Sequence, residues 1–180
     1  MLFRSWVNVP YLSCPAQIQD LAKALSWVEP GRTAIVPGLS DPMGDVMRGE
    51  EVQIFGAVTS GQLANSALVC QPGTHTKWAR ITQDRVVQFT TSMTGELFAL
   101  LKNHSLLADY LQGEVVDGTL FRNGVRDGLS GHLASQLFGV RAKALMGLRA
   151  ATDSAAYTSG LLIGHDVSRE DLSPGQVVHI

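Results

Sequence analysis

The chain has 180 residues, of which 45% are apolar and 17% charged, and its formal net charge is −2 at pH 7. These values are typical of a globular protein with a hydrophobic core, and they exclude a largely disordered chain. No basic cluster or nucleic-acid-binding motif points to a nucleic-acid partner, and no apolar stretch approaches the ~20 residues of a membrane span.

The first third of the chain is predicted to contain two helices and one strand. Apolar residues recur at helical spacing over residues 16–28, and a Pro-Gly pair follows this helix. A short strand covers 33–36, a loop rich in Pro and Gly covers 37–44, and a second helix covers about 50–58. The Thr-Ser-Gly run at 59–61 marks a boundary.

The middle of the chain is predicted to form a meander of three antiparallel strands. The strands cover about 67–71, 76–82 and 85–91, and Gln83-Asp84 is a tight hairpin connection. Residues 72–76 then form the tip between the first two strands.

From Thr94 onward the pattern is helical. Thr94 is predicted to be the N-cap of a helix whose apolar stripe is supplied by leucines at helical spacing. Residues 176–180 are predicted to form a buried strand, and no turn or cap follows it, which suggests that the chain is cut short. Further helical patches are expected near 105–111, 117–129, 131–138, 140–148 and 153–164.

The cysteines and the N-terminus indicate a cytoplasmic protein. Cys14 and Cys70 are far apart and lack Cys-x-x-Cys spacing, which favours reduced thiols over a disulfide framework. Residues 1–6 lack the apolar core of a signal peptide. The histidines show no metal-ligand spacing, so no metal ligands are assigned.

The turn at 72–78 is a candidate phosphate cradle. A Gly-Thr turn lets backbone N–H groups face an anion because Gly73 has no side chain in the way. The hydroxyl of Thr74 and the ammonium of Lys77 could add donors, and His75 either touches the phosphate or caps the turn. A Pro-Gly pair between strands can equally be a simple turn. The glycine spacings of a Walker A loop and of a dinucleotide fingerprint are absent.

A second candidate segment is Asp45-Val46-Met47-Arg48-Gly49-Glu50-Glu51. It follows a short strand and enters the helix at about 50–58, and in α/β sheets ligands bind in that crevice. The acids also have a structural explanation, since negative charge in a first helical turn complements the helix dipole.

Several motifs, in their order, resemble the 2-dehydro-3-deoxygalactonokinase family. The resemblance covers nearly the whole chain, and several separate motifs in the right order are far more specific than any one of them. Its carriers are Val9-Pro10-Tyr11-Leu12-Ser13-Cys14-Pro15-Ala16, Ile35-Val36-Pro37-Gly38-Leu39, Val46-Met47-Arg48-Gly49-Glu50-Glu51, Pro72-Gly73-Thr74-His75-Thr76-Lys77-Trp78, Met93-Thr94-Gly95-Glu96-Leu97-Phe98, Asn103-His104-Ser105-Leu106 and Ser159-Gly160-Leu161-Leu162-Ile163-Gly164.

The resemblance implies an α/β chain with a partial actin-like ATPase (sugar kinase) fold and two incomplete lobes. Residues 1–62 would be a remnant of the first, substrate-side lobe, and residues 63–180 an incomplete second, nucleotide-side lobe. The implied reaction moves the γ-phosphoryl of ATP to the 6-hydroxyl of 2-dehydro-3-deoxy-D-galactonate, with Mg²⁺, in bacterial galactonate breakdown.

Two departures from the family pattern limit this expectation. Family members begin with three strands that carry an Asp-x-Gly-Ser/Thr phosphate motif, and they continue into a Gly-rich adenosine motif. The chain contains neither stretch. We therefore expect an internal fragment that lacks both ends of its parent kinase and is inactive alone. The alternative is a non-catalytic remnant that binds sugar acid or phosphate without turnover. A kinase of the same fold for another epimer also remains open, and an oligomer is possible.

Within this kinase reading, each candidate residue has an expected role. The attacking hydroxyl must lose a proton, so Glu50 or Glu51 is the catalytic base, with Glu50 preferred. Arg48 would bind the substrate carboxylate, because a guanidinium fits a carboxylate with two parallel hydrogen bonds. The alternative for Arg48 is a salt bridge to Glu51 or Asp45. Phosphate binding is assigned to Gly73, Thr74, His75 and Lys77.

Overall fold

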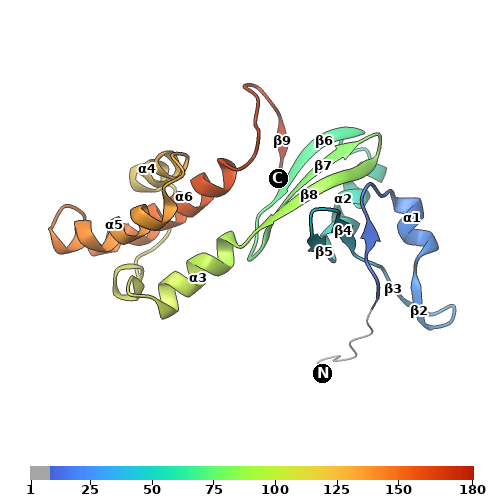
Figure 1. Cartoon of the computed structure of the whole chain (residues 1–180), viewed down its shortest axis with the longest axis horizontal. Coiled ribbons are helices and arrows are strands. Elements are labelled where there is room, and N and C mark those ends of the chain that lie inside the picture. Colours follow the sequence, from blue (N-terminus) through green and yellow to red (C-terminus); the bar gives the residue numbers. More distant parts are fainter. Residues whose placement is uncertain (1–8) are drawn as a thin grey trace. The chain divides into compact units, whose positions relative to one another are not determined.

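Figure 1 shows the computed structural model of the chain, which describes residues 9–180. Residues 1–8, which begin the predicted segment 1–62, lie outside the described part. The chain is a mixed α/β protein that divides into two compact units. Unit 1 comprises residues 1–72, 76–91 and 177–180, and unit 2 comprises residues 73–75 and 92–176.

Unit 1 contains most of the strands, arranged in three small sheets. Their orders are β1-β4-β5, β2-β3 and β8-β7-β6-β9. The elements are β1 Leu12–Ser13, α1 Ile18–Lys23, β2 Ser26–Glu29, β3 Thr33–Ile35, β4 Leu39–Asp41, β5 Asp45–Met47, α2 Glu50–Thr59, β6 Ser66–Gln71, β7 Thr76–Thr82, β8 Arg85–Ser92 and β9 Val178–His179, with Ser92 belonging to unit 2.

The register of the first sheet brings three distant segments to one end. β1 runs parallel to β4 with Leu12 opposite Leu39, and β4 runs antiparallel to β5 with Leu39 opposite Met47. The residues just before Leu12, just before Leu39 and just after Met47 therefore lie at the same end of the sheet. This end carries residues 48–51, the second half of the candidate segment at 45–51.

The predicted meander is confirmed as β6, β7 and β8. β6 and β7 pair antiparallel with Cys70 opposite Trp78, and β7 lies between β6 and β8. Gln83 and Asp84 both have positive φ, 52° and 61°, the pattern of a type I′ hairpin turn. α2 packs Ile54 and Phe55 into the unit 1 core. The core consists of Cys14, Ala16, Leu21, Leu39, Met47, Ile54, Phe55, Val69, Ala79, Ile81, Val86 and Phe89.

Unit 2 is helical. Its elements are α3 Thr94–His104, the 3-10 turn η1 Ala108–Tyr110, α4 Thr119–Gly128, α5 Leu133–Leu145, the 3-10 turn η2 Ala151–Asp153 and α6 Ser154–Val167. Its core consists of Leu107, Leu111, Val140, Tyr157 and Leu161.

α4 and α6 of unit 2 cross in backbone contact, as Figure 1 shows. Glycines four residues apart face the partner helix on both sides, at Gly124 and Gly128 on α4 and at Gly160 and Gly164 on α6. A Cβ added at any of them would lie 2.1–2.3 Å from a carbonyl oxygen of the other helix. Because a real Cβ does not fit at such distances, this crossing requires glycine.

The structure corrects several predicted elements. The helix expected over 16–28 ends at Lys23, because Ser26–Glu29 pairs with Thr33–Ile35 as a strand. The loop expected at 37–44 contains β4 and the turn into β5. The patches at 131–138 and 140–148 merge into the single helix α5.

One further expectation differs from the structure. Thr94 is the first residue of α3 and Met93 is the N-cap; the Thr94 Oγ1 donates instead to Asp166 Oδ2 at 2.8 Å. The lobes predicted at 1–62 and 63–180 stay a prediction, and the compact units divide the chain at other residues. Core residues of α2, β6, β7 and β8 pack together, so strands beyond 62 cluster with the first segment. Within residues 9–180, no helix is both long and apolar enough to cross a bilayer.

Candidate active site

The junction between β5 and α2 carries two carboxylates that fold back onto its backbone. Gly49 precedes the helix with φ of 111°, a conformation that favours glycine. Glu50 Oε2 accepts a hydrogen bond from the Arg48 N–H at 3.1 Å, and Glu51 Oε2 accepts one from the Gly49 N–H at 2.6 Å. Both side chains therefore accept from backbone N–H groups just before the helix, which is the structural role expected for acids at this position.

The two glutamates differ in burial. Glu51 is 1% exposed, whereas Glu50 is half-buried. Burial raises the pKa of the Glu51 carboxyl and the charge of Glu50 raises it further, while the N–H groups of Glu51 and Gly49 and the charge of Arg48 act in the opposite direction. Only Glu50 keeps a surface that a ligand can reach, which agrees with the preference for it as base. The assignment stays a prediction.

Arg48 is exposed and is held by the segment that leads into β1. Its Cζ lies 4.4 Å from the centroid of the Tyr11 ring, and its Nη2 donates to the Val9 carbonyl oxygen at 2.6 Å. Among the described residues, Arg48 takes part in no ion pair within 4 Å, so the alternative salt bridge to Glu51 or Asp45 is not formed. Its guanidinium is therefore available to an anionic ligand.

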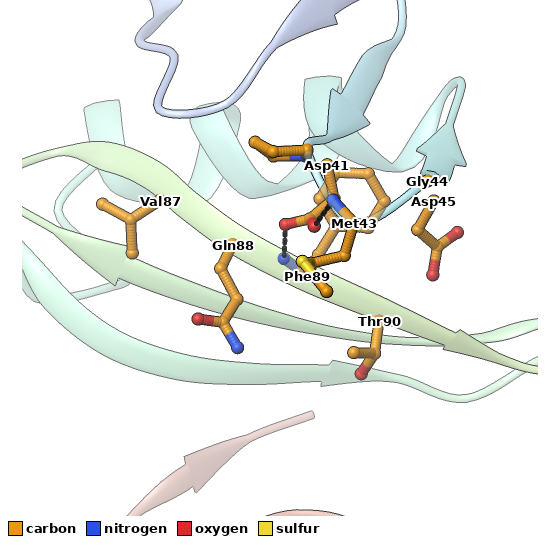
Figure 2. Close-up of a pocket in the computed structure, with 9 residues that line it drawn as sticks. Asp41, Met43, Gly44, Asp45, Val87, Gln88, Phe89 and Thr90 are labelled. Carbon is orange, nitrogen blue, oxygen red and sulfur yellow. Dashed lines mark hydrogen bonds between the residues drawn. The ribbon is translucent and has the colours of Figure 1, made fainter.

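Two aspartates of the β4–β5 hairpin bind the backbone of β8. Asp41 Oδ2 accepts from the Phe89 N–H at 3.3 Å, and its Oδ1 accepts from the Met43 N–H at 2.8 Å (Figure 2). Asp45 Oδ2 accepts from the Thr91 N–H at 2.5 Å. These carboxylates satisfy N–H groups of a strand at the edge of its sheet, and such groups otherwise lack partners.

The same hairpin borders an open pocket of about 490 Å³. Figure 2 shows the hairpin on one side of it and side chains of β8 on the other. The sequence-based reasoning assigned no role to Asp41. The signal that could have found it is the Asp-Pro-Met-Gly-Asp spacing, typical of an Asx turn. The lining residues are Asp41, Pro42, Met43, Gly44, Asp45, Val87, Gln88, Phe89 and Thr90.

Lys77 joins β5 to β8 inside unit 1. Its side chain is buried, with 6% of the residue exposed, and its Nζ donates to the Val46 carbonyl oxygen at 2.8 Å and to Thr91 Oγ1 at 2.6 Å. Thr91 Oγ1 in turn donates to Asp45 Oδ1 at 2.7 Å. The Lys77 ammonium therefore has a structural role, since it connects β5 with β8. Its contact with a phosphate stays a prediction.

The turn at 73–75 is exposed and packs on the first turn of α3 within unit 2. The Glu96 N–H donates to the Thr74 carbonyl oxygen at 2.9 Å, and His75 Nε2 lies 2.5 Å from Glu96 Oε2. A Cβ added at Gly95 would lie 2.5 Å from the Gly73 carbonyl oxygen, so glycine is required there too. The prediction that 73–75 is a turn between strands is confirmed.

The backbone amides of this turn are unused. Within the described residues, the N–H groups of Gly73 and Thr74 donate to none of the hydrogen bonds, and both residues are exposed. His75 Nε2 pairs with Glu96, and its other ring nitrogen has no partner in the described part of the chain. The turn belongs to unit 2, whereas Arg48, Glu50, Glu51 and Lys77 belong to unit 1, and its binding of a phosphate stays a prediction.

The described residues provide no cage for a metal made of protein alone. Within residues 9–180, no group of three or more His, Cys, Asp or Glu side chains is arranged to hold an ion. Mg²⁺ in phosphoryl-transfer sites is typically held by one or two carboxylates together with substrate phosphates. A protein-only magnesium site therefore does not fit these residues, and no step below uses one.

Comparison with protein-family models matches residues 3–180 to the family described as 2-keto-3-deoxy-galactonokinase. The 2-dehydro-3-deoxygalactonokinase of Escherichia coli (strain K12) is 39% identical over 167 residues, which cover 91% of this chain and 56% of that protein. The "Probable 2-dehydro-3-deoxygalactonokinase DgoK1" of Rhizobium meliloti (strain 1021) is 37% identical over 184 aligned residues, 97% of this chain and 60% of that protein.

A solved structure is also similar. It is the crystal structure of a protein from Sinorhizobium meliloti described as a "putative 2-dehydro-3-deoxygalactonokinase", with a TM-score of 0.86 and 35% sequence identity. The match covers 96% of this chain and 61% of that one. The chain thus spans somewhat more than half the length of the relatives it matches.

Proposed function

The chain belongs to the 2-keto-3-deoxy-galactonokinase family, and from this premise we propose that it supplies the acid-binding junction and a phosphate-binding turn of a sugar-acid kinase. The reaction is transfer of the ATP γ-phosphoryl to the 6-hydroxyl of 2-dehydro-3-deoxy-D-galactonate, in the cytoplasm. The observation that carries the proposal is the β5–α2 junction, where the Arg48 guanidinium, which has no carboxylate partner among residues 9–180, and the reachable Glu50 carboxylate lie two residues apart in the chain.

Glu50 acts as the base in this proposal. The 6-hydroxyl oxygen attacks the γ-phosphorus, the bond from that phosphorus to the bridging oxygen breaks, and the hydroxyl proton passes to the Glu50 carboxylate. Glu50 is half-buried and its Oε2 accepts from the Arg48 N–H, so its position is fixed while the side chain stays reachable. Glu51 is almost fully buried and holds the Gly49 amide, which suits a structural role.

Arg48 binds the substrate carboxylate. A guanidinium receives a carboxylate through two parallel N–H···O bonds in its own plane, and Arg48 has no carboxylate partner among the described residues. This assignment explains why the substrate would be a sugar acid rather than a neutral sugar.

The turn at 73–75 is a separate element that binds a phosphate group of the nucleotide. Its two unused amides and the His75 ring can donate to phosphate oxygens, and fixed donors of this kind stabilise charge without reorganising. Mg²⁺, when bound with the nucleotide, would neutralise charge on the phosphate oxygens. The likeness to a solved structure at a TM-score of 0.86 supports the further proposal that the units are incomplete lobes of an actin-like ATPase fold.

The test begins with binding, which does not require the complete parent enzyme. The chain of residues 1–180 is titrated with 2-dehydro-3-deoxy-D-galactonate and, separately, with D-galactose as a neutral probe, by isothermal calorimetry. We expect binding of the sugar acid and its loss in Arg48→Met, with no binding of galactose. Failure of the wild-type chain to bind the sugar acid would overturn the proposal.

Turnover is measured next, by ³¹P NMR with ATP, Mg²⁺ and the sugar acid. Where a 6-phosphate forms, Glu50→Gln is expected to lower kcat at least ~100-fold, since the loss of a general base typically costs 10²–10⁴. Glu51→Gln should lower it less. A second candidate is a protein that holds the sugar acid without phosphorylating it, and the supporting observation is that the chain spans only 56% and 60% of the two curated relatives. Binding without turnover by the chain alone fits both candidates, so the same measurement on a chain extended to the length of those relatives separates them: turnover supports the kinase, and its absence supports the second candidate.

A further inference from the structure

The Arg48 guanidinium is exposed, yet two groups from one short segment fix it. Its Cζ lies over the Tyr11 ring, 4.4 Å from the ring centroid, and the Val9 carbonyl oxygen accepts from Nη2 at 2.6 Å. An exposed arginine without such contacts samples many rotamers, and a ligand that binds it must order the side chain. Here the contacts order it before any ligand arrives.

The position of Tyr11 is itself fixed by Gly38. A Cβ added at Gly38 would lie 2.7 Å from the Tyr11 ring atoms Cδ1 and Cε1 and 2.2 Å from the Met47 carbonyl oxygen. The ring therefore rests against a glycine backbone that leaves room for no side chain. The Leu12 N–H donates to the Gly38 carbonyl oxygen at 2.9 Å, which holds the Tyr11 backbone at the same place.

The sheet register explains why these residues meet. Tyr11 precedes Leu12, Gly38 precedes Leu39 and Arg48 follows Met47, and those three partners are aligned across β1, β4 and β5. Gly38 thus lies at the end of the middle strand, between Tyr11 and Arg48, and the Tyr11 ring contacts both the Gly38 backbone and the Arg48 guanidinium. This arrangement is built into the pairing of the strands rather than into a mobile loop.

We propose that Tyr11 is a positioning residue that holds Arg48 ready to bind the carboxylate of the sugar acid. The inference rests on the proposed function and deepens it. Aromatic stacking covers a face of the guanidinium and leaves its edges free, and a carboxylate binds at an edge. The guanidinium has two edges that each present two parallel N–H groups, the Nη1–Nη2 edge and the Nε–Nη2 edge, and each edge uses a different Nη2 hydrogen. The Val9 carbonyl accepts one Nη2 hydrogen, so the other edge remains free for a carboxylate.

The first experiment tests positioning without a ligand. In ¹⁵N-labelled chain 1–180, the Nε–Hε resonance of Arg48 is assigned by its disappearance in Arg48→Lys. We expect a ring-current shift of Hε in the wild type that persists in Tyr11→Phe and disappears in Tyr11→Leu. Tyr11 is 40% exposed, so the substitution leaves the core in place, and unchanged amide resonances of β6 and β7 verify folding. An Hε shift identical in the wild type and Tyr11→Leu would overturn the inference.

The second experiment tests what the positioning does. Titration with 2-dehydro-3-deoxy-D-galactonate should give a Kd about tenfold higher for Tyr11→Leu than for the wild type, and a near wild-type Kd for Tyr11→Phe. Equal affinity of the wild type and Tyr11→Leu would overturn the inference and leave the proposed function intact. Absence of binding by the wild type, with the ring-current result as expected, would overturn the proposed function and the substrate role of Arg48 together.

Discussion

Units 1 and 2 hold their elements together by different means. Unit 1 packs large apolar side chains and joins two of its small sheets through buried polar groups, among them Asp41 and Lys77. Unit 2 brings α4 and α6 into backbone contact through four glycines. In unit 1 the side chains make the contact, whereas in unit 2 the contact depends on their absence.

This difference predicts that the two units are destabilised by opposite kinds of substitution. A unit held by buried polar groups is weakened when one partner of a hydrogen bond is removed, because the other partner stays buried without it. A unit held by glycine contacts is weakened when even a methyl group is added, because two helices must move apart. The predictions below test this contrast, beginning with the largest effect.

Gly160→Ala should have the largest effect on stability. Its Cβ would lie 2.1 Å from the Phe121 carbonyl oxygen and 3.0 Å from the Val125 nitrogen, and both are backbone atoms of a helix that cannot yield locally. We expect the free energy of unfolding to fall by roughly 3 kcal/mol, the upper end of the usual cost of overpacking. Urea titration followed by helical circular dichroism measures it.

The matched control for Gly160→Ala is Gly139→Ala on α5. No atom lies within 4 Å of a Cβ added there, so the change introduces alanine into a helix without a clash. Alanine favours the helix over glycine by about 1 kcal/mol or less, and the control should be neutral or slightly stabilised. Equal losses in both variants would show that the α4–α6 contact is not what requires glycine.

Lys77→Met tests the polar side of the comparison. It leaves the Val46 carbonyl and Thr91 Oγ1 without their donor in a buried site, and we expect a loss of about 2 kcal/mol in the free energy of unfolding. Lys23→Met, at an exposed lysine of the same unit, should stay within about 0.5 kcal/mol of the wild type. Unchanged stability of Lys77→Met combined with lost nucleotide binding would instead assign Lys77 to the phosphate.

The elements predicted well from the sequence are those whose hydrophobic pattern extends over six or more consecutive residues. The meander has strands of six to eight residues with turn chemistry between them, and α2 begins at its two acids as expected. The strands that were missed, β1, β2, β4 and β5, have two to four residues each. A pattern with period two cannot be recognised over so few positions, and only pairing with distant segments makes them strands.

The membership of the candidate site stays a prediction, and the contacts of its residues could not be predicted from the sequence. The gathering of Arg48 and Glu50 at a strand-to-helix junction follows from motif order alone. The stacking of Tyr11 on Arg48 depends on a register between strands 27 residues apart, from Leu12 to Leu39, which no local pattern encodes. Likewise, the burial of Lys77 follows from β7 lying inside its sheet, with neighbours on both sides.

Gly95→Ala tests whether a glycine contact costs less when its partner can move. The added Cβ would lie 2.5 Å from the Gly73 carbonyl oxygen, but Gly73 is in an exposed turn rather than a helix. We expect a loss of about 1 kcal/mol, the lower end of the cost of overpacking, together with amide chemical-shift changes centred on 73–75. A loss as large as that of Gly160→Ala would mean that the turn is as rigid as the helix pair.

Glu51→Gln should have the smallest effect, and one that appears only as a dependence on pH. Because burial raises the pKa of Glu51 in the folded chain, the folded state holds its proton at pH values where the unfolded state has lost it. This carboxyl therefore makes the free energy of unfolding decrease as pH rises from about its ordinary pKa of 4.5 to the raised value.

Glutamine does not titrate, and its amide oxygen can still accept from the Gly49 N–H. Urea titrations between pH 4 and 7 should show a flatter profile for Glu51→Gln. Glu50→Gln leaves Glu51 and its burial in place and removes only the smaller contribution of the Glu50 charge to the raised pKa, so it should keep most of the wild-type slope. Identical slopes in the wild type and Glu51→Gln would mean that the buried carboxylate carries its charge in the folded chain at no cost, and that the N–H groups of Gly49 and Glu51 offset its burial in full.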